Sequence, residues 1–327
     1  MSLFAASSQA ADTLGAIKKR GALNCGVNVG LAGFSIPDSA GNWTGLDVDI
    51  CRGIAAAIFG TGDKVKFFPY NAQQRFTALQ SGEVDILSRN TTMTLTRDSK
   101  NGFEFLPVVY YDGAQFMVKT NSKFKSAKEL ANQSICVQSG TTTELVMNEF
   151  FNSNKIKFKP VVMAEQIDSE NAFFSGRCQA LVTDGSGLAA VRAGRNLTDK
   201  DYRILPEVIS KEPLAAAIRK DDPNFRTVAY WTVNVLMAAE EFGITKANVD
   251  QMKSSDNVEI KRILGVEPGI GASMGIDDSW AYNAIKAVGN YGEIFERNVG
   301  QGSALKLKRG LNAQWNKGGL VYAPPIR

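Results

Sequence analysis

Residues that could hold a charged small molecule gather in three polar segments, and each segment directly follows an apolar, β-branched run. The segments are 88–97, 139–144 and 184–187, and they include Arg97 and Asp184. An arginine can hold a carboxylate through two parallel hydrogen bonds, and an aspartate can pair with an ammonium group. Because ligands of open α/β sheets sit beyond the carboxyl ends of the strands, the three segments together predict a site for a zwitterion.

The segment 139–144 also carries the pattern of a helix start. Thr141 and Glu144 have the spacing of a capping box, with Thr141 as the N-cap. The first turn of such a helix offers free N–H groups and the positive end of the helix dipole, and both suit a carboxylate. Taken singly, a capped helix or a loop aspartate has an ordinary structural role. The prediction of a binding site therefore depends on the three segments together.

The composition argues against several other functions. The 327-residue chain has no histidine, which removes the commonest general base and the commonest metal ligand. Lys and Arg total 37 against 33 Asp and Glu, and no basic run typical of nucleic-acid binding is present. No apolar stretch approaches the ~20 residues that span a membrane. We expect no metal, no cofactor and no nucleic-acid partner.

The four cysteines, Cys25, Cys51, Cys136 and Cys178, fit no Cys-x-x-Cys zinc or redox motif. An even, sparse set suits one or two structural disulfides in an oxidising compartment, whereas four buried free thiols in a cytosolic protein are the alternative. Residues 4–12 have the small side chains found around a signal-peptidase site. They favour an exported protein whose signal peptide is largely removed, and a disordered Ala/Ser leader is the other interpretation.

Strands and helices alternate along the first half of the chain, which indicates an α/β architecture with parallel strands. The alternation then repeats, and in both blocks a helix that ends at Ser-Gly precedes a buried strand. The repeat predicts two lobes built alike. The first block has strands at 23–28, 65–68 and 84–87 and helices at 47–59 and 73–80, and the second has strands at 135–138, 160–163 and 180–183 and helices at 142–151 and 168–174.

Two further segments are expected to connect the lobes. The β-prone run 108–118 is predicted to be one long strand that crosses from the first lobe to the second, and 207–213 to cross back. Residues 214–218 would then return to the first lobe. From Phe225 onward the chain is predicted to be mainly helical. The clearest helices are 232–242 and 280–295.

Several of these segments match the motifs of a known family. The polar amino-acid-binding proteins of ABC importers are similar at 45–50, in the spacing from Thr92 to Arg97, at 137–141 and at 176–184. The branch that takes up glutamate, glutamine, aspartate and asparagine resembles the chain more closely, at 88–92, 110–113, 288–293 and 318–327. The resemblance covers nearly the whole chain from about Asp12.

The resemblance implies the type II periplasmic-binding fold, in which two α/β lobes, each a mainly parallel sheet flanked by helices, are followed here by a helical C-terminal extension. The expected boundaries are 12–112 for the first part of lobe 1, 113–211 for lobe 2, and 212–327 for the return to lobe 1 and the extension. The implied protein is the periplasmic solute-binding subunit of an amino-acid ABC transporter. It would close around Glu, Gln, Asp or Asn, be recognised by a membrane permease and catalyse nothing. We expect a monomer.

The resemblance also assigns ligand contacts by position. Arg97 would clamp the α-carboxylate, with help from Thr92 and from the backbone N–H of Thr142 in the helix that Thr141 caps. These three contacts would hold one end of an amino acid.

The other end and the side chain of the ligand are assigned in the same way. The backbone carbonyl of Asn90 and the carboxylate of Asp184 would take the α-ammonium. Arg75 would face a side-chain carboxylate, and a solvated helix arginine is its alternative role. Asn28 and Gln166 fall where relatives place groups that contact the ligand side chain.

The sequence departs from the family pattern at three of these positions. Many relatives place aromatic side chains on both sides of the ligand side chain, but Leu31 and Ala72 stand at those places, so stacking is not expected. Thr142 stands where many relatives have glycine, which reduces the clearance beside the ligand.

An enzyme on the same fold, such as a dehydratase acting on a small carboxylic acid, is the alternative function. Without histidine, the acid or base would have to be Glu144, Glu170 or Asp184. The sequence has no closely spaced pair of carboxylates and no phosphate loop to support this alternative.

Four cysteines allow three pairings, and the two lobes favour one of them. Cys25 and Cys136 each lie in the first strand of their block, and Cys51 and Cys178 lie in the same blocks. We predict the disulfides Cys25–Cys51 and Cys136–Cys178.

Overall fold

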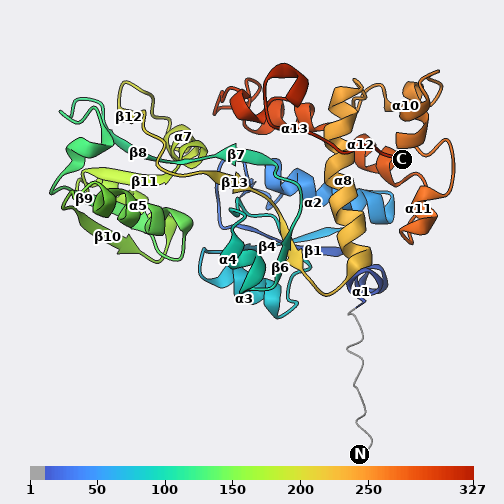
Figure 1. The fold of residues 1–327 in the computed structure, drawn as a ribbon, viewed down its shortest axis with the longest axis horizontal. Coiled ribbons are helices and arrows are strands. Elements are labelled where there is room, and N and C mark those ends of the chain that lie inside the picture. The colour runs from blue at the N-terminus through green and yellow to red at the C-terminus, as the bar shows by residue number, and fades with distance from the viewer. Residues whose placement is uncertain (1–11) are drawn as a thin grey trace, which may run out of the picture.

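The computed structural model describes residues 12–327, which form two lobes joined by a pair of short strands (Figure 1). The predicted leader at 4–12 lies almost wholly outside the described residues. Lobe 1 contains both ends of the described chain, and lobe 2 is built from one continuous stretch between the two connections.

The sheet of lobe 1 is mixed. Its strand order is β4-β1-β5-β14-β6, in which β1 runs parallel to β4 and β5, whereas β14 runs antiparallel to β5 and β6. Its last strand in chain order, β14, follows the whole of lobe 2 and completes the sheet. The bounds are β1 (Leu23–Asn28), β4 (Val65–Tyr70), β5 (Ile86–Leu87), β6 (Phe103–Phe105) and β14 (Ala217–Arg219).

The sheet of lobe 2 has the same plan, as the repeat in the sequence predicts. Its order is β10-β9-β11-β8-β12, with β9 parallel to both of its neighbours and β8 antiparallel to β11 and β12. Half of the strand pairings in each lobe are therefore antiparallel, and neither sheet is mainly parallel. The bounds are β8 (Ala114–Lys119), β9 (Ser134–Gln138), β10 (Lys159–Met163), β11 (Ala180–Asp184) and β12 (Tyr202–Ile204).

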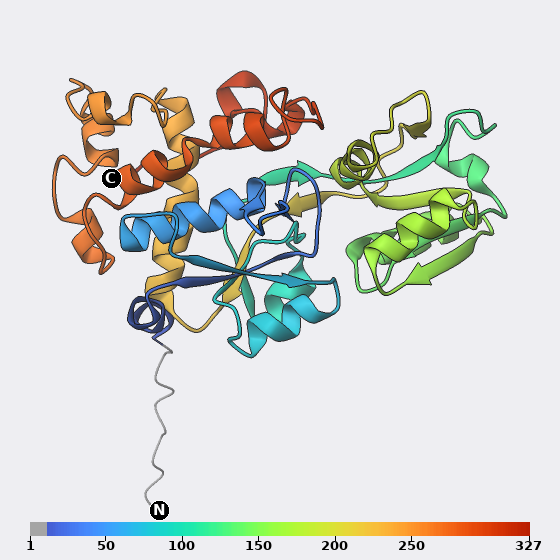
Figure 2. The ribbon, with the colours of Figure 1, turned by 180° about the vertical axis from the view of Figure 1, so that it is seen from behind.

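Helices cover both faces of each sheet (Figure 2). In lobe 1, α2 packs with the later helices α8 and α12 on one face, while Ala78 and Leu79 of α3 pack against Val84 and Leu87 on the other. In lobe 2, two separate apolar clusters lie on the two faces of the sheet. The bounds are α2 (Leu46–Phe59), α3 (Gln74–Gln80), α5 (Thr142–Ser153), α6 (Gln166–Phe174), α7 (Gly185–Gly194), α8 (Pro223–Glu241) and α12 (Trp280–Val288).

The run 108–118 is not one strand. It divides into β7 (Tyr110–Asp112), which pairs with β13 (Glu212–Leu214) as the connection between the lobes, and β8 of the lobe 2 sheet. The division falls at Gly113, where an added Cβ would lie 2.6 Å from the carbonyl oxygen of Ser210. The returning chain therefore approaches too closely for a side chain, and the strand is interrupted there.

The predicted helix 280–295 is also divided. It forms α12 and α13 (Tyr291–Asn298), separated by Gly289, whose φ of 76° no helix residue adopts. Asn290 then starts α13, because its side chain accepts a hydrogen bond from Glu293 N while the Glu293 side chain accepts one from Asn290 N. This reciprocal pair satisfies two N–H groups at a helix start, so the new helix begins although the apolar spacing continues across it.

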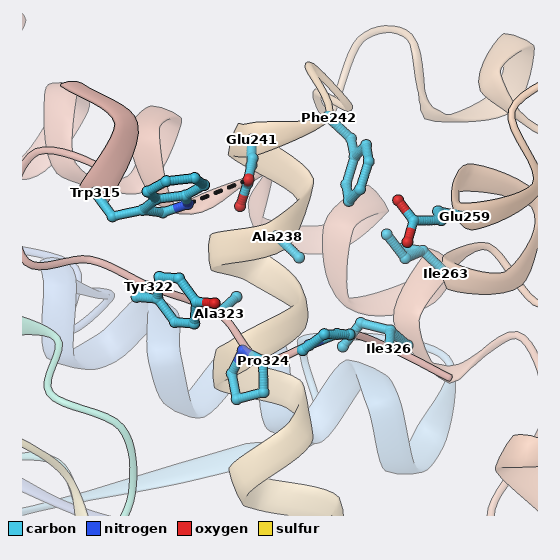
Figure 3. A pocket seen from close by; sticks show the side chains of 11 residues that line it. Ala238, Glu241, Phe242, Glu259, Ile263, Trp315, Tyr322, Ala323, Pro324 and Ile326 are labelled. Carbon is cyan, nitrogen blue, oxygen red and sulfur yellow. Dashed lines mark hydrogen bonds between the residues drawn. The ribbon is translucent and has the colours of Figure 1, made fainter.

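The C-terminal extension packs on lobe 1 and also holds the connection between the lobes. Asn312 accepts a hydrogen bond from Tyr111 N at 2.6 Å and donates one to Tyr111 O at 3.2 Å, and the Tyr291 hydroxyl donates to Val109 O at 2.7 Å. Nearer its end, the chain lies along α8, where Trp315 Nε1 donates to Glu241 (Figure 3). The pocket between them measures about 160 Å³ and is far from the lobe boundary.

The remaining elements are short. They are α1 (Thr13–Arg20), β2 (Ile36–Pro37), β3 (Trp43–Thr44), α4 (Leu95–Ser99), η1 (Ala127–Leu130), α9 (Val249–Met252), α10 (Val258–Ile263), α11 (Ile270–Ser273), η2 (Gly310–Asn312) and η3 (Trp315–Lys317).

Two disulfides are present, Cys25–Cys51 and Cys136–Cys178, with Cα atoms 6.4 Å and 5.7 Å apart. The first joins β1 to α2 within lobe 1, and the second joins β9 to the loop before β11 within lobe 2. In the part of the chain that the structure describes, no helix has the length and apolar character needed to cross a membrane.

Candidate ligand-binding site

The three polar segments meet where the two lobes face each other. Asn71 Nδ2 donates to Glu165 Oε1 at 2.7 Å, and Gln73 Nε2 donates to Ser139 Oγ at 3.1 Å. The hydroxyl oxygens of Thr92 and Thr142 are 3.3 Å apart. Each contact joins lobe 1 to lobe 2, so the lobes are closed on one another in this structure.

Arg75 lies in the first turn of α3, directly after the carboxyl end of β4. Arg75 is only 3% exposed, yet its guanidinium group makes no hydrogen bond and no ion pair with any residue in 12–327. Burial, followed by the positive charges of Arg89 and Arg97, holds its pKa well below the usual range, while Asp184 of the opposite lobe opposes that shift. An unpaired buried cation is costly, so this guanidinium is available for an anion.

Arg97 stands beside Arg75. The two guanidinium carbons are 5.0 Å and 4.7 Å from the centre of the same ring, that of Phe76. Arg97 is held in place by α4, whose N-cap is Thr94, and its Nη1 donates to Thr92 O at 2.6 Å. Burial also lowers the pKa of Arg97. One edge of its guanidinium is thus engaged by the protein.

Asp184 faces these arginines from lobe 2. It is the last residue of β11 and is 6% exposed, and its carboxylate accepts no hydrogen bond from the residues that the structure describes. Burial, together with the negative charges of Asp112 and Glu212, raises its pKa well above the usual range. An ammonium group placed here would oppose that shift, because a positive charge favours the carboxylate.

Glu212 is a site residue that the sequence analysis missed. It lies in β13 and is almost fully buried. Its Oε2 accepts hydrogen bonds from the hydroxyls of Thr92 at 2.6 Å and Thr142 at 2.9 Å, and its Oε1 accepts one from Ser210. The two threonine side chains therefore point at Glu212. A glutamate in a predicted connection between the lobes was the only hint of this role in the sequence. Its partners Thr92 and Thr142 come from distant segments, so no local motif identifies it.

Asn90 adopts a φ of 38°, which turns its backbone between the lobes. Its N–H donates to Asp47 Oδ2 at 2.8 Å, while its carbonyl oxygen accepts no hydrogen bond from any described residue. Burial raises the pKa of Asp47 to about 6, and its hydrogen bonds with Asn90 and Ser88 and the charge of Arg89 oppose that rise. The strained turn at Asn90 is therefore fixed by a buried carboxylate.

Arg89 is a second buried group that the sequence analysis did not place. Its Nε donates to Tyr70 O at 3.2 Å and its Nη1 to Asn90 Oδ1 at 3.3 Å, but its Nη2 has no partner within residues 12–327. Burial lowers its pKa to about 10. Three guanidinium groups thus lie in one region of lobe 1.

Asn28 and Gln166 already have partners in the protein. Asn28 Nδ2 donates to Asn90 Oδ1 at 3.1 Å, and its Oδ1 accepts from Gly30 N at 3.2 Å. Gln166 Nε2 donates to Glu170 Oε1 at 3.1 Å. Each amide nitrogen thus donates one of its two N–H groups to the protein.

Thr141 caps α5 as predicted, since its hydroxyl oxygen accepts a hydrogen bond from Glu144 N at 3.1 Å. The second half of the predicted capping box differs. Glu144 Oε2 accepts from Gly140 N rather than from Thr141 N, because Gly140, with a φ of 72°, turns its N–H toward the helix. The helix start itself lies at the lobe boundary, as expected.

No aromatic side chain occupies the positions of Leu31 and Ala72, and both residues are buried. Leu31 lines a pocket of about 400 Å³ between the lobes. Within the described residues, no cluster of acidic or cysteine side chains could hold a metal ion.

Comparisons with known proteins agree with this architecture. The chain matches the family of bacterial extracellular solute-binding proteins, family 3, over residues 23–247. It is 54% identical over 324 residues to the general L-amino acid-binding periplasmic protein AapJ of Rhizobium johnstonii, covering 98% of this chain and 95% of that protein. It is 47% identical over 328 residues to the glutamate/glutamine/aspartate/asparagine-binding protein BztA of Rhodobacter capsulatus, covering 100% of this chain and 97% of that one.

A solved structure shows the same fold over nearly the whole length. An ABC transporter periplasmic binding protein from Brucella ovis with glutathione bound is 53% identical, with a TM-score of 0.94, and covers 97% of this chain and 100% of that one. The family match ends at residue 247. The similarity to AapJ and to the Brucella ovis protein covers nearly the whole chain, so both share the extension beyond that residue. The relatives are described as binding proteins, not enzymes, and the dehydratase alternative is set aside. The chain belongs to family 3 of the bacterial extracellular solute-binding proteins, with the two-lobed type II periplasmic-binding fold.

Proposed function

We propose that this protein is the solute-binding subunit of an amino-acid ABC importer and that it closes around one polar L-amino acid. The observation that carries the proposal is the pair Arg75 and Asp184. They are buried, oppositely charged, contributed by opposite lobes, and unpaired among the described residues. An amino acid that presents its ammonium group to Asp184 and its side chain to Arg75 would satisfy both lobes at once, so the ligand favours the closed state over the open one.

The ligand contacts follow from the available groups. Arg97 and the backbone N–H of Thr142 would hold the α-carboxylate, and Asp184 with the carbonyl of Asn90 would hold the α-ammonium. Thr92 and Thr141 would act by shaping this end of the site, since the Thr92 hydroxyl is engaged by Glu212 and Thr141 caps α5.

The side chain of the ligand would face Arg75, with Asn28 and Gln166 nearby. An arginine can donate hydrogen bonds to a carboxylate or to an amide carbonyl. Leu31 and Ala72 offer no aromatic surface on which a ligand side chain could stack. Asp, Glu, Asn and Gln should therefore bind better than Leu, Phe or Lys. The name of BztA, a glutamate/glutamine/aspartate/asparagine-binding protein, supports this ligand class.

The wider setting is part of the same proposal. We assign residues 12–112 and 212–327 to lobe 1 and its extension, and 113–211 to lobe 2. The two disulfides and the periplasmic relatives support export to the periplasm. The partner would be a membrane permease, which recognises the closed monomer.

Identification of the bound molecule tests the proposal. Native mass spectrometry of the purified protein should find an unchanged amino acid, and a thermal-shift screen should show the largest stabilisation with Asp, Glu, Asn or Gln, because a ligand of the folded state raises the melting temperature. If Leu or Lys stabilised the protein most, the polar-ligand assignment would be wrong.

Arg97→Ala gives a second test. Loss of the carboxylate partner inside a closed site should weaken binding by about 2–5 kcal/mol, measured by calorimetry. Arg177→Ala, which removes an exposed arginine of lobe 2, should leave the affinity unchanged. Near-wild-type affinity in Arg97→Ala would contradict the carboxylate assignment.

A γ-glutamyl peptide is a second candidate ligand. The Brucella ovis structure has glutathione bound and is similar over nearly the whole chain, and a pocket lies between the lobes beside the proposed site. Glutathione belongs in the same thermal-shift screen. A shift larger than that of glutamate would favour it as the preferred ligand.

A further inference from the structure

A pocket of about 400 Å³ opens between the lobes on the side of Asn28 and Gln166. Lobe 1 contributes the loop after β1, and lobe 2 contributes α6 and α7. Its volume lies within the range of small-molecule sites in proteins. The residues that matter here are Leu31, Ile36, Glu170, Asn171, Gly194 and Arg195.

Two hydrogen bonds link the lining of the pocket to residues of the proposed amino-acid site. On lobe 1, Asn28 Oδ1 accepts from the N–H of Gly30, which lines the pocket. On lobe 2, Gln166 Nε2 donates to Glu170, which also lines it. The groups expected near the end of an amino-acid side chain are therefore bonded to the wall of the pocket.

The lining has an apolar base and one polar edge. Leu31 and Ile36 supply apolar surface, and Ile36 is 39% exposed. At the polar edge, Arg195 Nη2 donates to Asn171 Oδ1 at 2.9 Å and approaches Glu170 Oε2 at 3.4 Å. One cation and one anion give this edge no excess charge, but they offer both donors and acceptors.

Such a lining suits a peptide group better than a second free ion. A peptide unit carries one donor and one acceptor, which can meet the Glu170 or Asn171 oxygens and the Arg195 N–H groups. An ionised tail of either sign would meet a like charge as well as an opposite one. A purely apolar tail would leave the polar edge unmatched.

We propose that this pocket is a second subsite of the ligand site and takes an amide-linked extension of the ligand side chain, as in a γ-glutamyl peptide. The inference rests on the proposed function, because the amino-acid end of the ligand must be held by Arg97 and Asp184. The extension would leave that end at its γ-carbonyl, pass Asn28 and Gln166, and lie between Leu31 and Arg195.

Gly194 allows a direct test, because it ends α7 at the pocket and an added Cβ there would meet no atom within 4 Å. Gly194→Trp should fill the pocket with little disturbance. We expect the affinity for γ-L-glutamylglycinamide, a dipeptide whose amide-capped tail carries no charge, to fall at least about tenfold, while the affinity for L-glutamate stays at the wild-type value. Gly194→Ala is the matched control and should leave both affinities unchanged.

Arg195→Met is the second variant. Methionine keeps apolar contact with Phe174, over whose ring the guanidinium carbon lies at 4.3 Å, but it removes the donors. It should weaken the dipeptide selectively, by less than Gly194→Trp does. Calorimetry with both ligands and a melting curve of each unliganded variant complete the set.

The outcomes separate the two proposals. Wild-type protein that binds glutamate but not the dipeptide, or a Gly194→Trp variant that keeps wild-type dipeptide affinity, overturns the subsite and leaves the proposed function standing. Equal loss of both ligands in folded Gly194→Trp also overturns it, since the two subsites would not be separable. Wild-type protein that binds neither ligand contradicts the proposed function itself.

Discussion

Charged residues between the lobes fall into two groups, those that have hydrogen-bond partners in the protein and those that have none among the described residues. Glu212 and Asp47 are surrounded by hydrogen-bond donors from the protein. Arg75 and Asp184 are equally buried, but the described residues give them no partner. The satisfied charges fix the geometry of the site, and the unsatisfied ones favour a ligand that neutralises them.

Arg75→Ala should change specificity more than it changes overall affinity. A buried charge that loses its partner costs more free energy than a neutral carbonyl that does so. The variant should therefore weaken Asp and Glu more than Asn and Gln, as measured by calorimetry with all four. Equal losses for acids and amides would show that Arg75 does not contact the ligand side chain.

The raised pKa of Asp184 predicts that binding depends on pH. Its causes are burial, then Asp112 and Glu212, and the arginines 75 and 97 oppose them. A bound ammonium favours the carboxylate and lowers that pKa, so binding releases a proton wherever unliganded Asp184 is protonated. Affinity should then fall as the pH is lowered from neutral.

Calorimetry in two buffers of different ionisation enthalpy measures the released proton directly. Asp184→Asn, which cannot titrate, should bind weakly and lose most of this dependence. A small pH dependence should remain in that variant, because burial also raises the pKa of Asp112. A wild-type affinity that rises on acidification would contradict the ammonium assignment.

The polar segments after the strands were sufficient to predict Arg97 and Asp184 as members of one region, and the family resemblance added Arg75. They did not reveal Glu212 or Arg89. The roles of those two residues depend on β13 pairing with β7 and on the turn at Asn90, and such long-range neighbours leave no local pattern.

Among the elements, the break between α12 and α13 depends on very few residues. The apolar spacing from 280 to 295 predicts one helix, and only the Gly-Asn pair at 289–290 indicates an interruption. The division at Gly113 is similar, since the β-prone run continues through it. A positive φ decides the outcome at Gly289, and the close approach of Ser210 decides it at Gly113. Hydrophobic periodicity carries no information about either.

Asn290→Ala should lower the free energy of unfolding by about 0.5–2 kcal/mol, because the variant loses the cap and the bond from Asn290 Nδ2 to Ile244 O at 2.7 Å. Urea denaturation followed by circular dichroism measures the change. Asn283→Ala, inside α12, is the matched control, since no hydrogen bond of its side chain is present in the described structure. Equal effects of the two variants would contradict the importance of the cap.

For the molecule as a whole, the balance between open and closed states depends on contacts that never touch the ligand. Glu165→Ala removes the hydrogen bond from Asn71 across the lobe boundary. It should weaken all ligands by one common factor of about fivefold, the equivalent of one hydrogen bond, because it changes only the population of the closed state.

Affinities for Glu, Gln and Asp, measured side by side, check this expectation. Glu149→Ala, on the exposed side of α5, is the control and should leave all three unchanged. Losses that differed strongly between ligands would mean that Glu165 contacts the ligand side chain.

The two-lobed plan could be predicted from the repeat of strands and helices, and the structure follows it closely. The packing of the C-terminal extension could not. Its apolar spacing predicts helices, but the hydrogen bonds of Asn312 with Tyr111 join residues 201 positions apart. That attachment makes lobe 1 and the extension one body, and leaves lobe 2 attached mainly through its two connections.

The disulfides have a consequence for the order in which the protein matures. The first cysteine pairs with the second and the third with the fourth, and the two bonds do not interleave along the chain. A chain that appears from its N-terminus therefore presents each pair before the next begins. An oxidant that joins cysteines in their order of appearance produces the native set at once, and no reshuffling enzyme is needed to correct it. The lobe 1 sheet, in contrast, must wait for β14, which follows all four cysteines.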